Sequence, residues 1–160
     1  MKAMEVREHV FVDYHLLNIA AADLSPVLDP ASAQRLFVVM PEGSSLIVFT
    51  GCATGGVQVA VRALEEAPGS LADGLAGWEI AAEDDLVIDG DLYFLPAGGL
   101  GSVAFKVGTP GLHRVRVCAS GRAANYDLAV LESQEKYELS FWPVGARQGR
   151  SIAGGDGLEL

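Results

Sequence analysis

The chain has 160 residues, half of them hydrophobic and a fifth charged, which is the composition of a single globular domain and excludes an intrinsically disordered chain. Its formal net charge of −10 disfavours binding to nucleic acid or anionic lipid, since both reward Lys and Arg. No apolar run approaches the roughly 20 residues of a membrane helix, and the N-terminus lacks the apolar stretch of a secretory signal, so we expect a cytoplasmic protein that does not span a membrane.

The first expected element is a long strand near the start of the chain. From Met4 to Leu16 the even positions are mostly apolar and the odd positions mostly polar. This period of two predicts a half-buried strand with Tyr14 on its inner face. Residues 20–34 contain many Asp, Ser and Pro residues and predict a loop.

The next elements are three strands and an irregular segment. Residues 35–40 and 45–52 predict two strands, the second of them covered on both faces because its apolar residues do not alternate. Residues 57–63 alternate cleanly and predict a half-buried strand. Residues 65–77 are rich in Gly, Pro, Ser and Ala, and they predict a loop with a short helix around residues 71–75.

The second half of the chain continues the β pattern. Residues 78–82 and 86–95 predict strands, with Asp89-Gly90 as a two-residue hairpin turn. Residues 103–117 predict a hairpin across a Gly and Pro turn, and Tyr137 begins the last strand.

These elements predict an all-β fold, an antiparallel β-sandwich or jelly roll with about eight or nine strands and little helix. We expect one domain over residues 1–144 and a flexible Gly-rich tail over residues 145–160. The expected interior residues are Val12, Tyr14, Leu46, Val48, Val59, Val61, Phe105, Val115, Val117, Leu139 and Phe141.

Two cysteines and three histidines provide few candidate ligands. Cys52 and Cys118 lack the spacing of a zinc site, so we expect two buried, reduced thiols and neither metal nor cofactor. Asp13 and His15 are two apart on the predicted first strand, and His113 could reach them from a neighbouring strand to build a small metal or acid-base site. A solvated polar face is the preferred interpretation of these three residues.

An acidic cluster follows the predicted helix. Glu83, Asp84, Asp85, Asp89 and Asp91 place five carboxylates within nine residues around the predicted hairpin. Solvation in a hairpin loop is the preferred interpretation of the cluster. Calcium binding is an alternative, but the order of an EF-hand loop is absent. If the protein binds a basic partner, we expect these five carboxylates to form the contact surface. Pairing within the molecule is the expected use of Arg114 and Arg116, which lie on one outward face.

Several segments carry a resemblance to known proteins. Residues 111–117, Ser120-Gly121-Arg122, Tyr126-Asp127 and residues 137–143 look like a segment shared by uncharacterised bacterial proteins of this length. Together with Val12-Asp13-Tyr14-His15, the layout resembles the competence protein J family of small acidic β proteins, over about half of the chain and by strand order more than by motif. The resemblance implies a cytoplasmic sandwich whose acidic surface occupies the basic DNA-binding cleft of a nuclease or toxin.

Three classes of function remain open. The leading hypothesis is a non-catalytic protein-binding module, an inhibitor or immunity protein for a basic nuclease or toxin, which binds neither nucleic acid nor membrane. A jelly roll that binds a small ligand or carbohydrate would show a cavity lined by an aromatic residue such as Trp78 or Trp142. A hydrolase or metal-dependent enzyme would bring Asp13, His15 and His113 within hydrogen-bonding reach.

Overall fold

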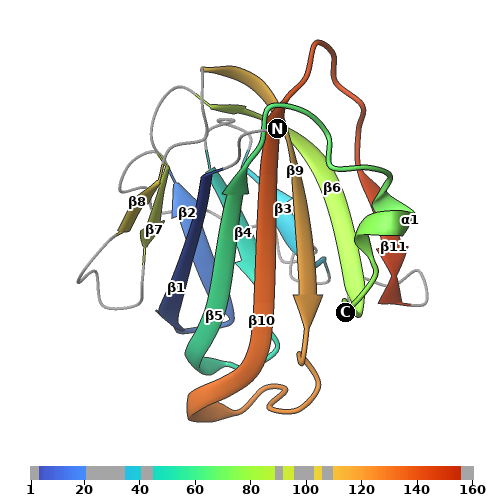
Figure 1. The fold of residues 1–160 in the computed structure, drawn as a ribbon. Helices are drawn as coiled ribbons and strands as arrows, with labels where there is room; N and C mark the ends of the chain where they lie inside the picture. Colours follow the sequence, from blue (N-terminus) through green and yellow to red (C-terminus); the bar gives the residue numbers. More distant parts are fainter. Residues whose placement is uncertain are drawn as a thin grey trace.

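Two β-sheets pack face to face in the computed structural model (Figure 1), which describes residues 4–20, 35–40, 45–88, 92–95, 103–105 and 110–155. Six strands form the larger sheet in the order β1-β5-β10-β9-β6-β11 and five form the smaller in the order β3-β4-β2-β7-β8. The predicted all-β class is confirmed. The bounds are β1 Met4–Val12, β2 Leu16–Ala20, β3 Phe37–Val39, β4 Ser45–Phe49, β5 Thr54–Ala63, β6 Ile80–Ile88, β7 Leu92–Leu95, β8 Val103–Phe105, β9 Gly111–Ser120, β10 Ala129–Pro143 and β11 Ser151–Gly154.

Helix α1, Leu71–Gly74, lies between β5 and β6, within the segment where the sequence predicts a short helix. The side chain of Ser70 caps its first turn by accepting a hydrogen bond from the backbone N–H of Asp73. Within the described ranges, no helix has the length and apolarity needed to cross a bilayer.

One strand pair departs from the predicted antiparallel pattern. β10 pairs with β5 in parallel and with β9 antiparallel, so the larger sheet is mixed. Val59 of β5 lies opposite Tyr137 of β10, and the pairing is irregular near the start of β10, between Ala129 and Lys136. Irregularities of this kind bend and twist a strand, and Figure 1 shows β10 curving near its start.

The core lies between the sheets and follows the predicted alternation, with two qualifications. Val59, Val61, Val115, Val117, Leu139 and Phe141 are buried, as are Val12, Leu46 and Val48. The prediction for Tyr14 is wrong, because β1 ends at Val12 and the chain turns sharply into β2, which belongs to the other sheet. The side chain of Phe105 lies outside the described residues.

The predicted hairpins at Asp89-Gly90 and over residues 103–117 are also wrong, because in each case the two strands belong to different sheets. β6 pairs with β9 and β11 in the larger sheet, whereas β7 pairs with β2 and β8 in the smaller sheet. The chain therefore crosses from one sheet to the other between Ile88 and Leu92. Asp89, Gly90 and Asp91 themselves lie outside the described residues.

Part of the predicted flexible tail is an element of the fold. Ser151–Gly154 forms β11, which pairs antiparallel with Glu83–Ile80 at the edge of the larger sheet. The backbone N–H groups of Gln148 and Gly149 donate to Asp85 at 2.9 and 2.7 Å. The Gly-rich composition hides this docking, because the side chain that holds the segment belongs to β6.

The outer face of the larger sheet is covered on one half and open on the other. Over β9, the thiol of Cys118 contacts the carbonyl oxygen of Gly74 in α1 at 3.8 Å, and Arg116 donates to the carbonyl oxygen of Gly69 at 2.7 Å. Over β1, β5 and β10, the outward side chains of Arg7, Gln58 and Lys136 are exposed. The boundary between the two halves runs beside Trp78.

Candidate functional site

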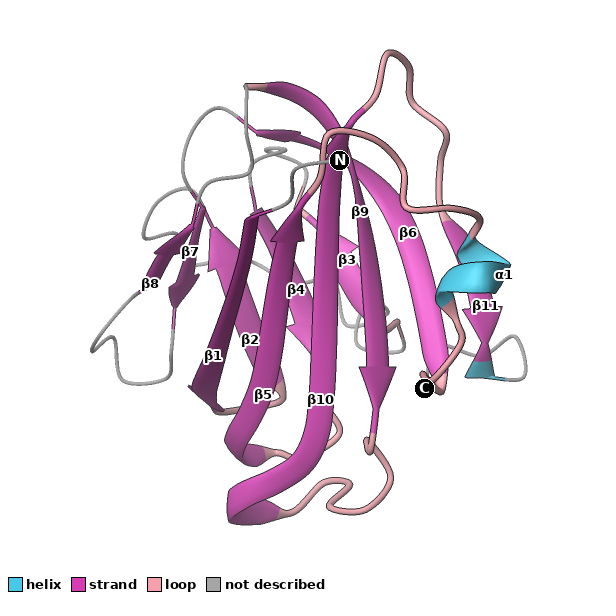
Figure 2. Ribbon diagram, viewed as in Figure 1, coloured by secondary structure: helices cyan, strands magenta, loops and turns pink. Residues whose placement is uncertain are grey.

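Three segments meet at one end of the sandwich, and we call this surface the loop end. It comprises residues 11–16 between β1 and β2, residues 50–54 between β4 and β5, and residues 121–132 between β9 and the start of β10. Figure 2 shows the connecting loops in pink beneath the strands of the larger sheet, at the lower end of the view. Because consecutive strands end here, side chains from distant parts of the chain share one surface.

The loop end carries every large apolar side chain that is exposed in the described part of the chain. These are Phe11, Tyr14, Tyr126, Leu128 and Leu131, with exposed fractions of 42, 81, 60, 52 and 87 %. Single exposed apolar residues are ordinary in proteins, but a gathering of them on one surface is typical of an interaction site.

Backbone strain gathers at the same surface. Within the described ranges, the non-glycine residues with positive φ are Tyr14 at 53°, His15 at 63° and Asp127 at 58°. Asp and His tolerate this region better than most residues, whereas for the bulky tyrosine it is an outlier. Strain of this kind persists only where neighbouring contacts hold the backbone in place.

His15 provides several of those contacts. Its backbone N–H donates to Ala53 and its carbonyl oxygen accepts from the N–H of Thr50, at 3.0 and 2.9 Å. The imidazole Nδ1 lies 2.8 Å from the carbonyl oxygen of Thr50, and Nε2 lies 3.0 Å from Oδ1 of Asp127. His15 therefore ties all three segments of the loop end together.

Two aspartates complete the network. The side chain of Asp13 accepts from the Thr54 hydroxyl at 2.5 Å and from the backbone N–H of Tyr14 at 2.9 Å. The backbone N–H of Asp127 donates to the carbonyl oxygen of Gly51 at 2.8 Å. The carboxylate of Asp127 contacts His15 but remains largely exposed. The loops are thus fixed by hydrogen bonds while their apolar side chains face solvent.

A buried carboxylate supports the loop end from beneath. Glu135 is fully buried and accepts hydrogen bonds from the backbone N–H groups of Gly51 and Cys52 at 2.6 and 2.8 Å. The hydroxyls of Ser133 and Tyr137 also donate to it, at 2.6 and 2.5 Å. Burial alone would raise the pKa of Glu135, but the hydrogen bonds from Ser133, Tyr137 and Cys52 outweigh it and hold this pKa below its ordinary value.

The same buried cluster contains one of the two thiols. Cys52 and Cys118 are both buried and free. Burial, followed by the hydrogen bond with Glu135, raises the pKa of Cys52 to about 11. For Cys118, burial beneath α1 raises the pKa to about 12. Neither thiol therefore has the exposed thiolate character of a reactive cysteine.

The charge of the loop end is negative. Asp13, Asp127 and Glu132 contribute carboxylates, and Glu132 lies 2.7 Å from the imidazole of His9. The basic side chain within these segments is Arg122, which is buried and donates to the carbonyl oxygen of Phe49 at 3.0 Å. The surface therefore presents apolar groups surrounded by carboxylates.

The structure separates the three residues of the predicted acid-base site. Asp13 and His15 belong to the turn at the loop end, whereas His113 is buried near the opposite end of β9, where it pairs with Pro143. Its Nδ1 lies 3.0 Å from the carbonyl oxygen of Gly111. The three side chains therefore do not converge, because β5 and β10 separate β1 from β9 and His113 lies at the end of β9 away from the loop end. Among the residues described, no three His, Cys, Asp or Glu side chains gather as a metal site would require.

The acidic cluster also differs from its predicted exposure. Glu83 and Asp85 are buried, where Glu83 pairs with Arg114 and Arg116 at 3.1 and 2.7 Å and Asp85 pairs with Arg114 at 3.1 Å. The register of β6 and β9 places these acids directly opposite the two arginines, so pairing within the molecule, the expected use of Arg114 and Arg116, is confirmed. Neither of these buried carboxylates is accessible to a partner protein.

The remaining acids of this cluster divide into two groups. Asp84 is partly exposed and lies 3.4 Å from Arg150. Asp89 and Asp91 lie outside the described residues. Within the described ranges, the carboxylates of Asp127 and Glu132 at the loop end are therefore more exposed to a partner than that of Asp84.

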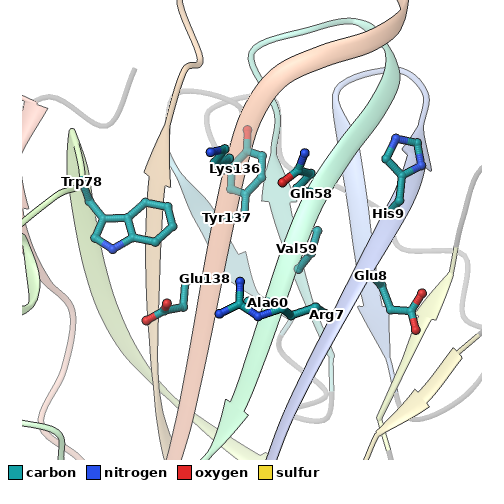
Figure 3. Close-up of a pocket in the computed structure, with 10 residues that line it drawn as sticks. All are labelled: Arg7, Glu8, His9, Gln58, Val59, Ala60, Trp78, Lys136, Tyr137 and Glu138. Carbon is teal, nitrogen blue, oxygen red and sulfur yellow. The ribbon is translucent and has the colours of Figure 1, made fainter.

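A groove of about 330 Å³ lies on the open half of the larger sheet (Figure 3). Arg7, Ala60 and Glu138 form one row across β1, β5 and β10, and the next row begins at His9 and continues through Gln58 and Lys136. Trp78 forms the wall beside β10. By contrast, Trp142 is buried, with the guanidinium of Arg116 5.4 Å from the centre of its ring.

Comparison with known proteins supports the fold. No family model matches the chain, and a search of the curated proteins finds no match. Among solved structures, the fold is similar to that of ComJ from Bacillus subtilis, described as an inhibitor of the DNA degrading activity of NucA. The TM-score is 0.62 over 90 % of this chain and 100 % of that chain, at 9 % sequence identity. The resemblance to the competence protein J family is thus confirmed at the level of the fold.

Proposed function

We propose that this chain is a non-catalytic inhibitor that acts by binding another protein, a nuclease, through the loop end. The observation that carries the proposal is that all large apolar side chains exposed in the described part of the chain lie on this one braced surface. The structural neighbour ComJ supports the class of partner, because it is described as an inhibitor of DNA degradation.

Burial of the apolar side chains against the partner would contribute binding free energy. Fully burying a large apolar side chain contributes about 1.5–3 kcal/mol, and tyrosines are among the residues that most often dominate protein interfaces. Tyr14 and Tyr126 lie on different segments of the loop end, and the rings of Tyr126 and His15 are 6.3 Å apart. We expect the two tyrosines to be the anchors of the contact.

The rigidity of the loop end lowers the cost of binding. A flexible loop loses conformational entropy when a partner orders it, and this loss subtracts from the affinity. Here the bonds of His15 to Thr50, Ala53 and Asp127 already hold the loops in one arrangement. A preorganised surface of this kind suits an inhibitor, which must remain bound to be effective.

The charges favour a basic partner. Asp127 and Glu132 are exposed beside the apolar side chains, and the whole chain carries a net charge of −10. A nuclease needs a basic cleft to hold the phosphates of DNA. An acidic, apolar surface that occupies this cleft would exclude DNA without any turnover. The cytoplasm as the place of action remains a prediction from the sequence.

Affinity capture followed by an enzyme assay tests the proposal. The protein is immobilised, captured proteins from the source cell are purified, and each is assayed for DNA degradation with increasing amounts of the free protein. We expect a captured nuclease whose activity falls to zero near one inhibitor per enzyme. The variant Tyr126→Ser/Leu131→Ser should neither capture nor inhibit it.

A matched control separates the loop end from general surface effects. Glu65 and Glu66 are exposed just beyond the opposite end of β5, so Glu65→Gln/Glu66→Gln alters the surface away from the loop end. This control should inhibit as well as the wild type. The proposal fails if no captured protein degrades DNA, or if both double variants inhibit equally well.

A further inference from the structure

We propose that the groove on the open half of the larger sheet is a second binding site, which takes a neutral, hydroxyl-rich ring, that is, a sugar. This inference does not rest on the proposed function. The site lies on the sheet face, whereas the proposed protein contact lies on the loops at its end.

The shape of the groove follows from one small residue and one covering segment. Ala60 lies between Arg7 and Glu138 in the same row of three strands, so a methyl group stands where both neighbours carry long side chains. The segment that contains α1 covers β9. Trp78, which follows α1 in the chain, lines the groove on that side (Figure 3). The hollow over Ala60 is therefore bounded by an indole on one side and by β1 on the other.

The lining combines the groups that a sugar requires. A sugar ring has an apolar C–H face, which packs against an aromatic ring, and hydroxyl groups that both donate and accept hydrogen bonds. Gln58 offers both donors and acceptors, Arg7 and Lys136 offer donors, and Glu138 offers acceptors. Trp78 is partly exposed and supplies the aromatic surface. A few polar groups converging beside an aromatic wall is typical of small-ligand sites.

The charges of the groove favour a neutral ligand. Arg7 lies 2.6 Å from Glu5, and Glu138 lies 3.4 Å from Arg62, so two of the charged lining residues have counter-ions on the protein. A phosphorylated ligand would also be repelled by the protein as a whole, because the net charge of the chain is −10. The volume of about 330 Å³ is at the lower end of the range for ligand pockets, which suits one or two rings.

Tryptophan fluorescence provides a direct test, because the chain contains two tryptophans and Trp142 is buried. The probes are glucose, galactose, mannose, N-acetylglucosamine and cellobiose, each titrated into the full chain and checked by calorimetry. Inorganic phosphate and adenosine monophosphate form the anionic arm. We expect a saturable change in emission with at least one neutral sugar, and no such change with either anion.

Two variants decide whether the response comes from the groove. Ala60→Leu fills the hollow without removing a polar group and should weaken sugar binding at least tenfold. Leu131→Ser at the loop end should leave sugar binding unchanged, and circular dichroism checks that both variants fold. A sugar response that is equal in Ala60→Leu and wild type overturns the site. The absence of any sugar response, or binding of an anion alone, overturns the assignment of the ligand.

Discussion

At the scale of single residues, Tyr14 has two properties that are costly in a folded chain. Its φ of 53° lies in the left-handed region, and its side chain is 81 % exposed. The left-handed conformation costs about 1–2 kcal/mol for a residue with a side chain, and an exposed ring recovers little of that cost through packing within its own chain. Such a residue is expected where the side chain acts on another molecule.

The variant Tyr14→Gly should therefore separate stability from binding. Glycine adopts positive φ without the steric penalty but loses more entropy on folding. We expect the free energy of unfolding to stay the same or rise by up to about 1 kcal/mol, as measured by urea denaturation. Binding to the captured nuclease should weaken at least tenfold, since loss of an interface anchor costs about 2 kcal/mol or more. A large loss of stability would instead show that the ring packs within the chain.

The second residue whose role can be measured is Glu135. Glu135→Gln replaces a buried carboxylate that accepts from Gly51, Cys52, Ser133 and Tyr137. We expect the free energy of unfolding at neutral pH to fall by about 1.5–3 kcal/mol, because hydrogen bonds to a charged group are lost and an amide N–H faces a donor. Glu132→Gln, an exposed change on the same strand, should cost less than about 1 kcal/mol.

The pH dependence of this difference has a defined sign. The pKa of Glu135 in the folded state lies below its ordinary value, which is about 4.3 in an unfolded chain. The stabilisation is therefore complete above the unfolded pKa and is lost as the pH falls through the folded pKa. Urea denaturation between pH 7 and pH 3 should show wild type and Glu135→Gln converging on the acid side. Divergence toward low pH would contradict the assignment.

At the scale of elements, β11 is attached both by its backbone pairing with β6 and by one carboxylate, Asp85, which holds the segment before it. Burial raises the pKa of Asp85, but hydrogen bonds from the backbone of Gly149 and Gln148 and from Arg114 outweigh it and hold this pKa below its ordinary value. The guanidinium of Arg114 also donates to the carbonyl oxygen of Gly149. One ion pair thus joins β6, β9 and the segment that leads into β11.

Neighbouring aspartates provide the matched test. Asp85→Asn should lower the free energy of unfolding by about 3–5 kcal/mol, because it leaves the buried Arg114 with an incomplete counter-ion. Hydrogen exchange in residues 145–155 should become faster. Asp84→Asn removes the same charge from a partly exposed pair with Arg150 and should cost less than about 1 kcal/mol. Equal effects of the two variants would show that the ion pair does not hold β11.

The strands and their inner faces could be predicted from the sequence because alternation depends on neighbouring residues. Val59, Val61, Val115, Val117, Leu139 and Phe141 are buried as the alternation predicts. Pairing could not be predicted in the same way. The parallel register of Val59 with Tyr137 and the crossing between β6 and β7 depend on strands far apart in the chain.

The site was harder to predict for the same reason. The exposed fraction of Leu131 and the contact of His15 with Asp127 arise from three loops that only the fold brings together. A dense run of acids looked exposed, but Glu83 and Asp85 are neutralised by arginines on the neighbouring strand. The available signal was the pair of short segments Asp13-Tyr14-His15 and Tyr126-Asp127, which the family resemblance already contained.

At the scale of the whole molecule, we expect the position of the negative charge to matter more than its amount for association with a partner. Asp127→Asn/Glu132→Gln removes two charges at the loop end, and Glu65→Gln/Glu66→Gln removes two beyond the opposite end of β5. Association with the captured nuclease should slow several-fold and lose part of its salt dependence in the first variant. Stopped-flow measurements at 50 and 150 mM salt give both quantities. Identical association rates for the two variants would show that association depends on the net charge and not on where the charges lie.

The parallel pair of β5 and β10 has a consequence for how the protein is made. β10 is the central partner of both β5 and β9, yet it is the second-last strand described in the chain. During synthesis, β5 and β9 must each wait with an open edge until residues 129–143 have left the ribosome. Pairings this distant in sequence form slowly, on a scale of about milliseconds to seconds. We therefore expect nascent chains arrested before Ala129 to be protease-sensitive and to need protection from aggregation. Since Asp127 and Leu128 also complete the loop end, a growing chain cannot form this surface until residues 127 and 128 have been translated.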